Sequence, residues 1–318
     1  MGVQPLDGQA PDGLPGTLVV LNKRGNDASF VDLASGRIVA TAPTGVGPHE
    51  LAISSDGRTG IVTDYEGPEG TLTVLDIPAG RRVRTISLAP YTRPHGIAYL
   101  PGDSLVAVTV EQDRAVLLVR VPEGGITAVL STGAEGSHMV AATGDGGTLW
   151  TGDIGSNTVT ELDVATRSRV RSLPAPAQPE AVNVTADGAR VFAGSNATGK
   201  VTVFDTRSGT SRTVAEGFGW PYRMFLTPAA GQLIVPDMRE DVLRFFDGDS
   251  YRELGRIPFP EQGPQGLTLH PDGRHLFLSL SQAGRVAVVD IAERRVVAHL
   301  PAGSGPDGVG FSPHPVSR

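Results

Sequence analysis

Three of the seven histidines stand at the same point of one repeated local pattern. The pattern occurs in "GPHEL", "RPHGI" and "GSHMV", and the three residues are His49, His95 and His138. A further copy, "PEAVNVT", has Glu180 at this point. Three neutral imidazole nitrogens and a carboxylate oxygen around an open position form a binding shell for a first-row transition metal. The pattern therefore predicts a metal site, provided that the fold brings these four side chains together.

The predicted shell favours iron or copper, because imidazole dominates it, and zinc or nickel would also fit. Magnesium fits less well, because it prefers an all-oxygen shell. Two alternatives stay open at this point. The same residues could serve as acid and base groups without a metal, since histidine titrates near neutral pH. Any one of the histidines could also be structural and hydrogen-bond a neighbouring loop.

The histidine pattern belongs to a longer repeat with seven copies. Consecutive copies are 42 to 46 residues apart, and their first residues are Pro48, Pro94, Ser137, Pro179, Pro221, Pro264 and Pro306. Within a unit, short alternating apolar runs are separated by Gly, Asp, Asn and Pro, which is typical of strands and turns. The unit 264–303 reads as four strands: "QGLTLH", "HLFLSL", "RVAVVDI" and "VVAHLPA". A period near 42 with four strands per unit predicts an all-β fold, a β-propeller.

The two ends of the repeat region complement each other. Residues 17–45 supply a second, third and fourth strand without a first, and residues 306–312 supply a first strand alone. Pairing them completes one blade, so we predict a seven-bladed propeller whose ring is closed by the C-terminal strand and the three N-terminal strands. The predicted divisions are a flexible lead-in over 1–16, one propeller over 17–313 and a tail over 314–318.

The repeat resembles the YVTN family of seven-bladed propeller repeats. The segments "PHGIAYLPGDSLVAVT", "TLWTGDIGSNTVTELDVAT" and "HPDGRHLFLSLSQAGRVAVVDI" show the resemblance, which covers residues 17–313. Propellers of this broad kind include lactonases, streptogramin-type lyases and surface-layer proteins, which are distant analogues. The resemblance therefore implies the scaffold and leaves the reaction open.

In a propeller the first strand of each blade lines the central channel, so one repeat position forms a ring at the mouth. We predict that four members of this ring bind the metal and that Tyr222, Arg223 and Asp307 on its other side are catalytic. Gln265 and Trp220 are expected to bind substrate. The ring position is occupied by His49, His95, His138, Glu180, Tyr222, Gln265 and Asp307.

The loops after the second strands form another ring near the same mouth. Its acidic members Asp64, Glu111 and Asp153 belong to the three blades that supply the histidines. We expect them to bind substrate or to hold an imidazole tautomer by accepting its other N–H. The alternative is that an acid at this point caps a turn.

Composition limits the partners. The net charge of −7 and the absence of a basic cluster argue against nucleic acid and anionic membranes as partners. No apolar run reaches the length of a membrane span, and the first residues show no signal peptide, so a cytoplasmic location is expected. The chain has no cysteine, which excludes thiolate metal sites. Protein partners are left open.

These observations favour a metal-dependent enzyme that acts on a small organic molecule at one mouth of the channel. The expected chemistry is oxidative or Lewis-acid, as in an oxidoreductase or in a lyase, isomerase or lactonase. The alternative from another class is a non-enzymatic binding or protein-interaction propeller. A third possibility is a metal-free lactonase or cycloisomerase that uses histidine and Arg223.

Overall fold

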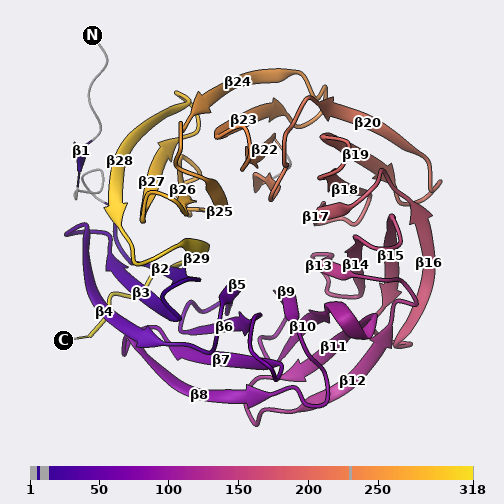
Figure 1. Cartoon of the computed structure of the whole chain (residues 1–318), viewed down its shortest axis with the longest axis horizontal. Coiled ribbons are helices and arrows are strands. Elements are labelled where there is room, and N and C mark those ends of the chain that lie inside the picture. Colours follow the sequence, from indigo (N-terminus) through magenta and orange to yellow (C-terminus); the bar gives the residue numbers. More distant parts are fainter. Residues whose placement is uncertain (1–5, 8–13, 229–230, 318) are drawn as a thin grey trace.

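The computed structural model describes residues 6–7, 14–228 and 231–317. It shows seven blades of four antiparallel strands around a central axis (Figure 1), which confirms the predicted seven-bladed β-propeller. The described residues contain no α-helix, and a short 3-10 turn, η1 (Glu111–Asp113), follows the second strand β10 (Leu105–Val110). No helix in these ranges has the length and apolar character needed to cross a membrane.

Each blade runs from an inner first strand to an outer fourth strand. The first strands are β5 (Pro48–Ile53), β9 (Pro94–Tyr99), β13 (Ser137–Ala142), β17 (Pro179–Val184), β21 (Phe225–Leu226), β25 (Pro264–Leu269) and β29 (Pro306–Ser312). The second strands are β2 (Thr17–Asn22), β6 (Thr59–Asp64), β10 (Leu105–Val110), β14 (Thr148–Asp153), β18 (Arg190–Ser195), β22 (Gln232–Asp237) and β26 (His275–Leu280). The third strands are β3 (Asp27–Asp32), β7 (Thr71–Asp76), β11 (Ala115–Arg120), β15 (Thr158–Asp163), β19 (Lys200–Asp205), β23 (Val242–Asp247) and β27 (Arg285–Asp290). The fourth strands are β4 (Arg37–Pro43), β8 (Arg81–Ser87), β12 (Ile126–Ser131), β16 (Ser168–Pro174), β20 (Ser211–Glu216), β24 (Glu253–Pro258) and β28 (Arg295–Pro301).

The ring closes as the sequence predicts. The C-terminal strand β29 pairs with β2 in the blade β29-β2-β3-β4, with Thr17 opposite Ser312. Most of the expected lead-in over 1–16 lies outside the described residues. Within it, β1 (Leu6–Asp7) pairs in parallel with the outer strand β28. In the tail, the Ser317 N–H donates to the carbonyl of Pro78 at 2.7 Å.

The core lies between neighbouring blades, where β-branched, leucine and aromatic side chains of the second and third strands interdigitate. Trp150 of β14, for example, packs in one cluster with Val184 and Phe204 of the next blade. Each of these side chains is at least 90% removed from solvent. Burial of this kind contributes about 25 cal/mol per Å² of apolar surface, and it makes the blades a rigid frame for the channel.

A β-bulge occurs at the ring position of the first strands. Pro48 lies opposite Asp64 and Leu51 opposite Val62, so His49 and Glu50 together face a single residue of β6. The same irregularity recurs in β9, β13, β17, β25 and β29. A bulge bends the strand and redirects side chains, so the ring residue and the residue after it can both approach the channel axis.

Candidate functional site

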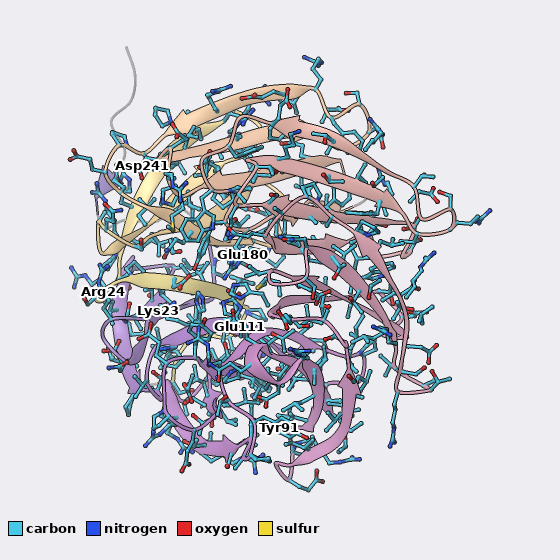
Figure 2. The ribbon with its side chains drawn as sticks, turned by 45° about the vertical axis from the view of Figure 1, so that its right-hand side comes forward. Lys23, Arg24, Tyr91, Glu111, Glu180 and Asp241 are labelled. Atoms are coloured by element: carbon cyan, nitrogen blue, oxygen red, sulfur yellow. The ribbon has the colours of Figure 1, made fainter. Side chains whose placement is uncertain are left out.

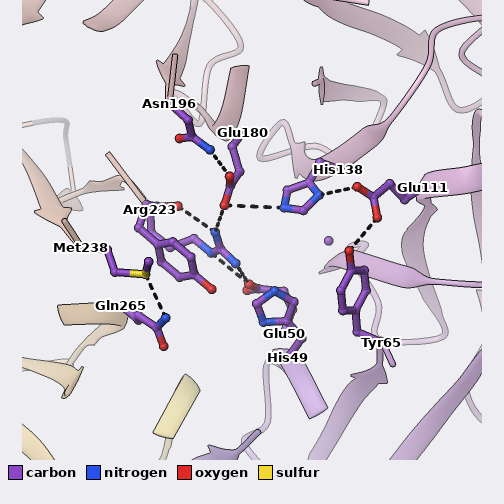
Figure 3. A network of polar contacts seen from close by, with 12 residues as sticks. His49, Glu50, Tyr65, Glu111, His138, Glu180, Asn196, Arg223, Met238 and Gln265 are labelled. Carbon is purple, nitrogen blue, oxygen red and sulfur yellow. Dashed lines mark hydrogen bonds and ion pairs between the residues drawn. The ribbon is translucent and has the colours of Figure 1, made fainter. Parts of the chain in front are cut away.

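The residues of the ring position gather at one mouth of the channel, as the repeat predicts. His49, His95 and His138 come from three consecutive blades, and all three are buried. Glu180, Tyr222 and Asp307 are also buried in this group, and Gln265 is half-buried. Figure 3 shows four members of this group, His49, His138, Glu180 and Gln265, around the mouth.

The three imidazole rings form a continuous stack. The ring of His95 lies edge-on to that of His49, with centroids 4.2 Å apart, and against that of His138, with centroids 3.4 Å apart. Tyr65 closes the group, with its ring centroid 5.0 Å from that of His95. The predicted convergence of three imidazoles is therefore seen in the fold.

His95 is the member of the stack whose ring nitrogens are both buried and without a hydrogen-bond partner among the described residues. Its side chain is 0% exposed. Burial, together with the nearby His138 and His49, lowers the pKa of His95 well below its ordinary value, so the ring is neutral. A buried polar group without a partner costs about 1–3 kcal/mol.

A group of possible ligand atoms surrounds this histidine. One side-chain atom each from His49, Glu50 and His95 lies within 4.8 Å of the others. Imidazole nitrogen and carboxylate oxygen are ligands that first-row transition metals share. A cation bound here would occupy a lone pair of His95 that is otherwise unused, so the residues fit a metal.

Asp307 fixes the orientation of His49. Its Oδ2 lies 2.6 Å from His49 Nδ1, an ion-pair contact whose angle does not meet hydrogen-bond geometry, and Nε2 is the other ring nitrogen that a ligand could use. The Tyr222 hydroxyl, 3.3 Å from Oδ1, and Lys23 Nζ, 3.8 Å from Oδ2, hold the carboxylate from the other sides. Burial alone would raise the pKa of Asp307, but His49 and Lys23 outweigh it and the pKa is lowered. An ionised carboxylate behind a histidine is the usual support of a metal-binding imidazole.

Glu50 is held by an arginine from across the channel. Arg223 Nε donates to Glu50 Oε1 at 2.9 Å, and its Nη2 contacts the same oxygen. Nη1 of Arg223 donates to the carbonyl of Tyr222 at 2.7 Å and lies 3.6 Å from Glu180 Oε1. Because both bonds to Glu50 fall on Oε1, its Oε2 remains available to a cation.

His138 and Glu180, the other two predicted metal ligands, lie beside this group and pair with each other. His138 Nε2 is 3.6 Å from Glu180 Oε1, and its Nδ1 is 3.3 Å from Glu111 Oε1. Asn196 also bonds Glu180 (Figure 3). Burial would lower the pKa of His138, but its bonds to the two glutamates outweigh it and the pKa is raised. In this arrangement both nitrogens of His138 face carboxylates.

A layer of polar and aromatic side chains covers the imidazole stack. The Tyr65 hydroxyl donates to Glu111 Oε2 at 2.8 Å, and Arg93 Nε donates to the same oxygen at 3.0 Å. The Arg93 guanidinium also lies over the Tyr65 ring, 4.2 Å from its centroid. Figure 2 labels Glu111 and Glu180 in the interior of the ring. Of the three acids predicted after the second strands, Glu111 is the one that reaches this site.

The structure does not bring Asp64 and Asp153 to the imidazoles. Asp64 accepts hydrogen bonds from Gly45 N at 2.9 Å and from the hydroxyls of Thr71 and Thr73. Asp153 accepts from Ser137, Thr158 and Thr160 in the same way. Both side chains are 0% exposed, and these bonds occupy both of their carboxylate oxygens. The two aspartates therefore cap the loops that lead into the first strands, so the turn-capping alternative holds for both.

Replacing Asp64 with asparagine is expected to change how stability depends on pH. Burial raises the pKa of Asp64 from 3.8 to about 6, so between these pH values the folded protein holds a proton that the unfolded chain has lost. Stability therefore falls as pH rises from 4 to 6, by up to about 3 kcal/mol. Asp64→Asn removes this loss, and Asn22 already caps the equivalent loop through Gly303 N at 2.8 Å.

The measurement is urea denaturation of the native protein and of Asp64→Asn at pH 4, 5, 6 and 7.5. The variant is expected to gain stability relative to the native protein as pH rises through this range. A difference that is constant with pH would show that Asp64 does not titrate in the folded protein.

Trp220 and Gln265 lie on the far side of the mouth. The Trp220 ring lies 6.1 Å from that of Tyr222, centroid to centroid, and the guanidinium of Arg239 lies 5.5 Å from its centroid. Gln265 Nε2 donates to the sulfur of Met238 at 3.1 Å. Neither side chain contacts the three residues that could hold a metal.

Glu50 was not predicted as a site residue, although the sequence contains a pattern that distinguishes its position. Three blades have glycine directly after the ring residue, where a Cβ would collide with the neighbouring backbone. A Cβ on Gly308, for example, would lie 2.5 Å from the carbonyl oxygen of His49. Glu50 and Arg223 stand at this position in their own blades. A charged residue at this repeat position, where other blades have glycine, therefore indicates a side chain that lines the channel.

Comparisons with known proteins agree with the fold. Residues 99–216 match the family model described as YNCE-like beta-propeller. No curated protein matches the chain. Hydrazine synthase of Kuenenia stuttgartiensis is similar in structure, with a TM-score of 0.78, 20% identity, and coverage of 91% of this chain and 96% of that one.

Two further solved structures have the same architecture. The periplasmic gluconolactonase PpgL of Pseudomonas aeruginosa has a TM-score of 0.74 and 17% identity, covering 94% of this chain and 99% of that one. A protein from Lactobacillus plantarum has a TM-score of 0.75 and 16% identity, covering 93% and 99%. At such identities the likeness shows the fold alone. The chain is a seven-bladed β-propeller similar to the YNCE-like family, and the resemblance predicted from its repeats is confirmed.

Proposed function

We propose that the chain is a metal-dependent enzyme that acts on a small organic molecule, with the ion held by His49, Glu50 and His95. The observation that supports this most strongly is the fully buried His95, both of whose nitrogens lack a partner among the described residues. Iron or copper is favoured by the imidazole ligands, and zinc or nickel would also fit. Such an ion supplies either Lewis acidity or the activation of dioxygen.

The neighbouring residues have distinct parts in this proposal. Asp307 keeps His49 in the tautomer whose Nε2 is free, and Arg223 keeps Glu50 turned so that one oxygen is free. His138 lies between Glu111 and Glu180, whose contacts raise its pKa against the effect of burial, and this makes it a candidate acid at its Nε2. Glu180 therefore stabilises the protonated form of His138, and Glu50 supplies the carboxylate ligand of the ion.

The proposal leaves two kinds of reaction open, oxidative chemistry and the Lewis-acid chemistry of a lyase, isomerase or lactonase. Two of the similar structures have enzyme names, hydrazine synthase and gluconolactonase, which is compatible with catalysis on this scaffold. The competing view is a non-enzymatic binding propeller, in which His95 would bind a ligand without catalysis.

Metal content tests the proposal. The native protein, incubated with each of Fe²⁺, Cu²⁺, Zn²⁺ and Ni²⁺ and desalted, is expected to retain about one equivalent of at least one ion by elemental analysis. His95→Ala is expected to retain less than about a tenth of that amount, because three ligands become two. His314→Ala is the matched control, since His314 bonds the backbone of Asp56 in the turn after β5. Equal metal content in the native protein and both variants, or none in any of them, would contradict the proposal.

A further inference from the structure

The channel beneath the imidazoles contains a cavity that borders the proposed metal site. The cavity has a volume of about 300 Å³, which is at the lower end for small-molecule pockets. Its charged lining residues are Glu50 and Arg223, Asn183 adds a polar side chain, and the other lining residues are small or apolar, for example Ala141 and Leu267. Glu50 therefore borders both the cavity and the group of possible metal ligands.

The outer side of the imidazole stack gives no comparable route to the ligands. His95 is 0% exposed and His49 is 4% exposed. Tyr65 lies over both rings, and Arg93 and Lys23 lie over Tyr65 in turn. A molecule that reaches the free oxygen of Glu50 from this side must displace that layer, whereas from the cavity it meets Glu50 directly.

The cavity continues toward the opposite face of the propeller. A second cavity of about 520 Å³ shares Ala142 and Asn183 with it as lining residues. The second cavity is also lined by Thr185 and Asp187, which belong to the turn after β17. The two cavities therefore adjoin each other, and a path from that face to the Glu50–Arg223 pair would run through both.

The charges around the site favour an anion at the end of this path. Glu50 and Arg223, the two charged residues that line the cavity, form an ion pair, so their charges cancel. A bound divalent ion adds positive charge to this balanced and buried group. Buried charge is stable only when it is compensated, and Arg223 already presents a guanidinium to the cavity.

We infer that the channel cavity is the substrate site of the proposed enzyme, and that it takes a small anionic molecule, such as a carboxylate, which enters from the face opposite the imidazoles. This inference rests on the proposed function, because the ion supplies the charge that the anion compensates. The volume of the cavity limits the substrate to a small molecule. Arg223 would bind its anionic group, and apolar lining residues such as Leu267 would contact the rest of it.

Azide binding to the Co²⁺-loaded protein tests the inference, with the visible absorption of the ion as the signal. Ala141→Trp fills the cavity from β13 and is expected to slow azide association at least tenfold while Co²⁺ content stays at the native level. Leu267→Phe narrows the cavity from β25 and is expected to act in the same direction, which keeps the test valid if the first variant does not fold. Val170→Trp, on the outer strand β16 at 55% exposure, is the control and is expected to behave as the native protein.

The outcomes separate the two proposals. Native-like azide rates in folded, Co²⁺-loaded Ala141→Trp or Leu267→Phe would overturn the channel route and leave the proposed metal site intact. Absence of Co²⁺ and of each of Fe²⁺, Cu²⁺, Zn²⁺ and Ni²⁺ from the native protein after loading would overturn the metal site, and with it this inference. Slowed association in the cavity variants alone is the result that we expect.

Discussion

Replacing Arg223 with methionine is expected to lower the free energy of unfolding by about 3–5 kcal/mol, the usual effect of breaking a buried ion pair from one side. Arg223 is 7% exposed and lies within ion-pair distance of Glu50 and Glu180. Without it, both glutamates lose a cationic partner in a buried mouth. Denaturation in urea at pH 7.5, followed by circular dichroism, measures the loss.

Two further variants show whether the loss comes from the unpaired charge. Arg114→Met removes an arginine whose pair with Glu135 is exposed, and it is expected to cost less than about 1 kcal/mol. The double variant Glu50→Gln, Arg223→Met removes both charges and is expected to recover more than half of the stability lost by Arg223→Met alone. A loss below about 1 kcal/mol for Arg223→Met would mean that the Glu50–Arg223 pair contributes nothing to holding the channel.

Replacing Asp307 with asparagine is expected to weaken metal binding about 10- to 100-fold, the range for residues that orient a metal ligand. Asp307 is 1% exposed, and its Oδ2 lies 2.6 Å from His49 Nδ1. Asparagine is close in size and can still accept a hydrogen bond, but it lacks the charge that raises the basicity of the imidazole. Competition with a chromophoric chelator at pH 7.5 measures the affinity for the ion that the native protein retains.

The matched control is Asp153→Asn, which changes a buried carboxylate that bonds Ser137, Thr158 and Thr160. Its metal affinity is expected to equal that of the native protein. Equal affinities for the native protein and Asp307→Asn would show that the pair with His49 has no part in binding an ion.

The fold could be predicted because the same strand-and-turn pattern occurs seven times in the sequence. One copy of "PHGIAYL" is compatible with several strands, but seven copies at nearly constant spacing leave few architectures. The closure of the ring followed from what each end lacked, and the pairing of Thr17 with Ser312 confirms it. The parallel pairing of Leu6–Asp7 with β28 has no repeat behind it and was not predicted.

The site was predictable only where the repeat itself places residues. The gathering of His49, His95 and His138 followed from the ring position, but the partner of each imidazole nitrogen depends on rotamers and bulges that a pattern does not contain. Glu50 enters the site because β5 is bulged. Asp64 shares its repeat position with structural caps, and it proved to be one of them.

Anomalous diffraction from crystals of the metal-loaded protein tests the central claim most directly. Data collected on either side of the absorption edge of the retained ion locate it independently of any assumed ligand. We expect one peak per chain, within about 2.0–2.2 Å of His49 Nε2, a ring nitrogen of His95 and a carboxylate oxygen of Glu50. A mouth without such a peak in crystals of protein that contains one equivalent of metal, or a peak coordinated by other residues, would contradict the account.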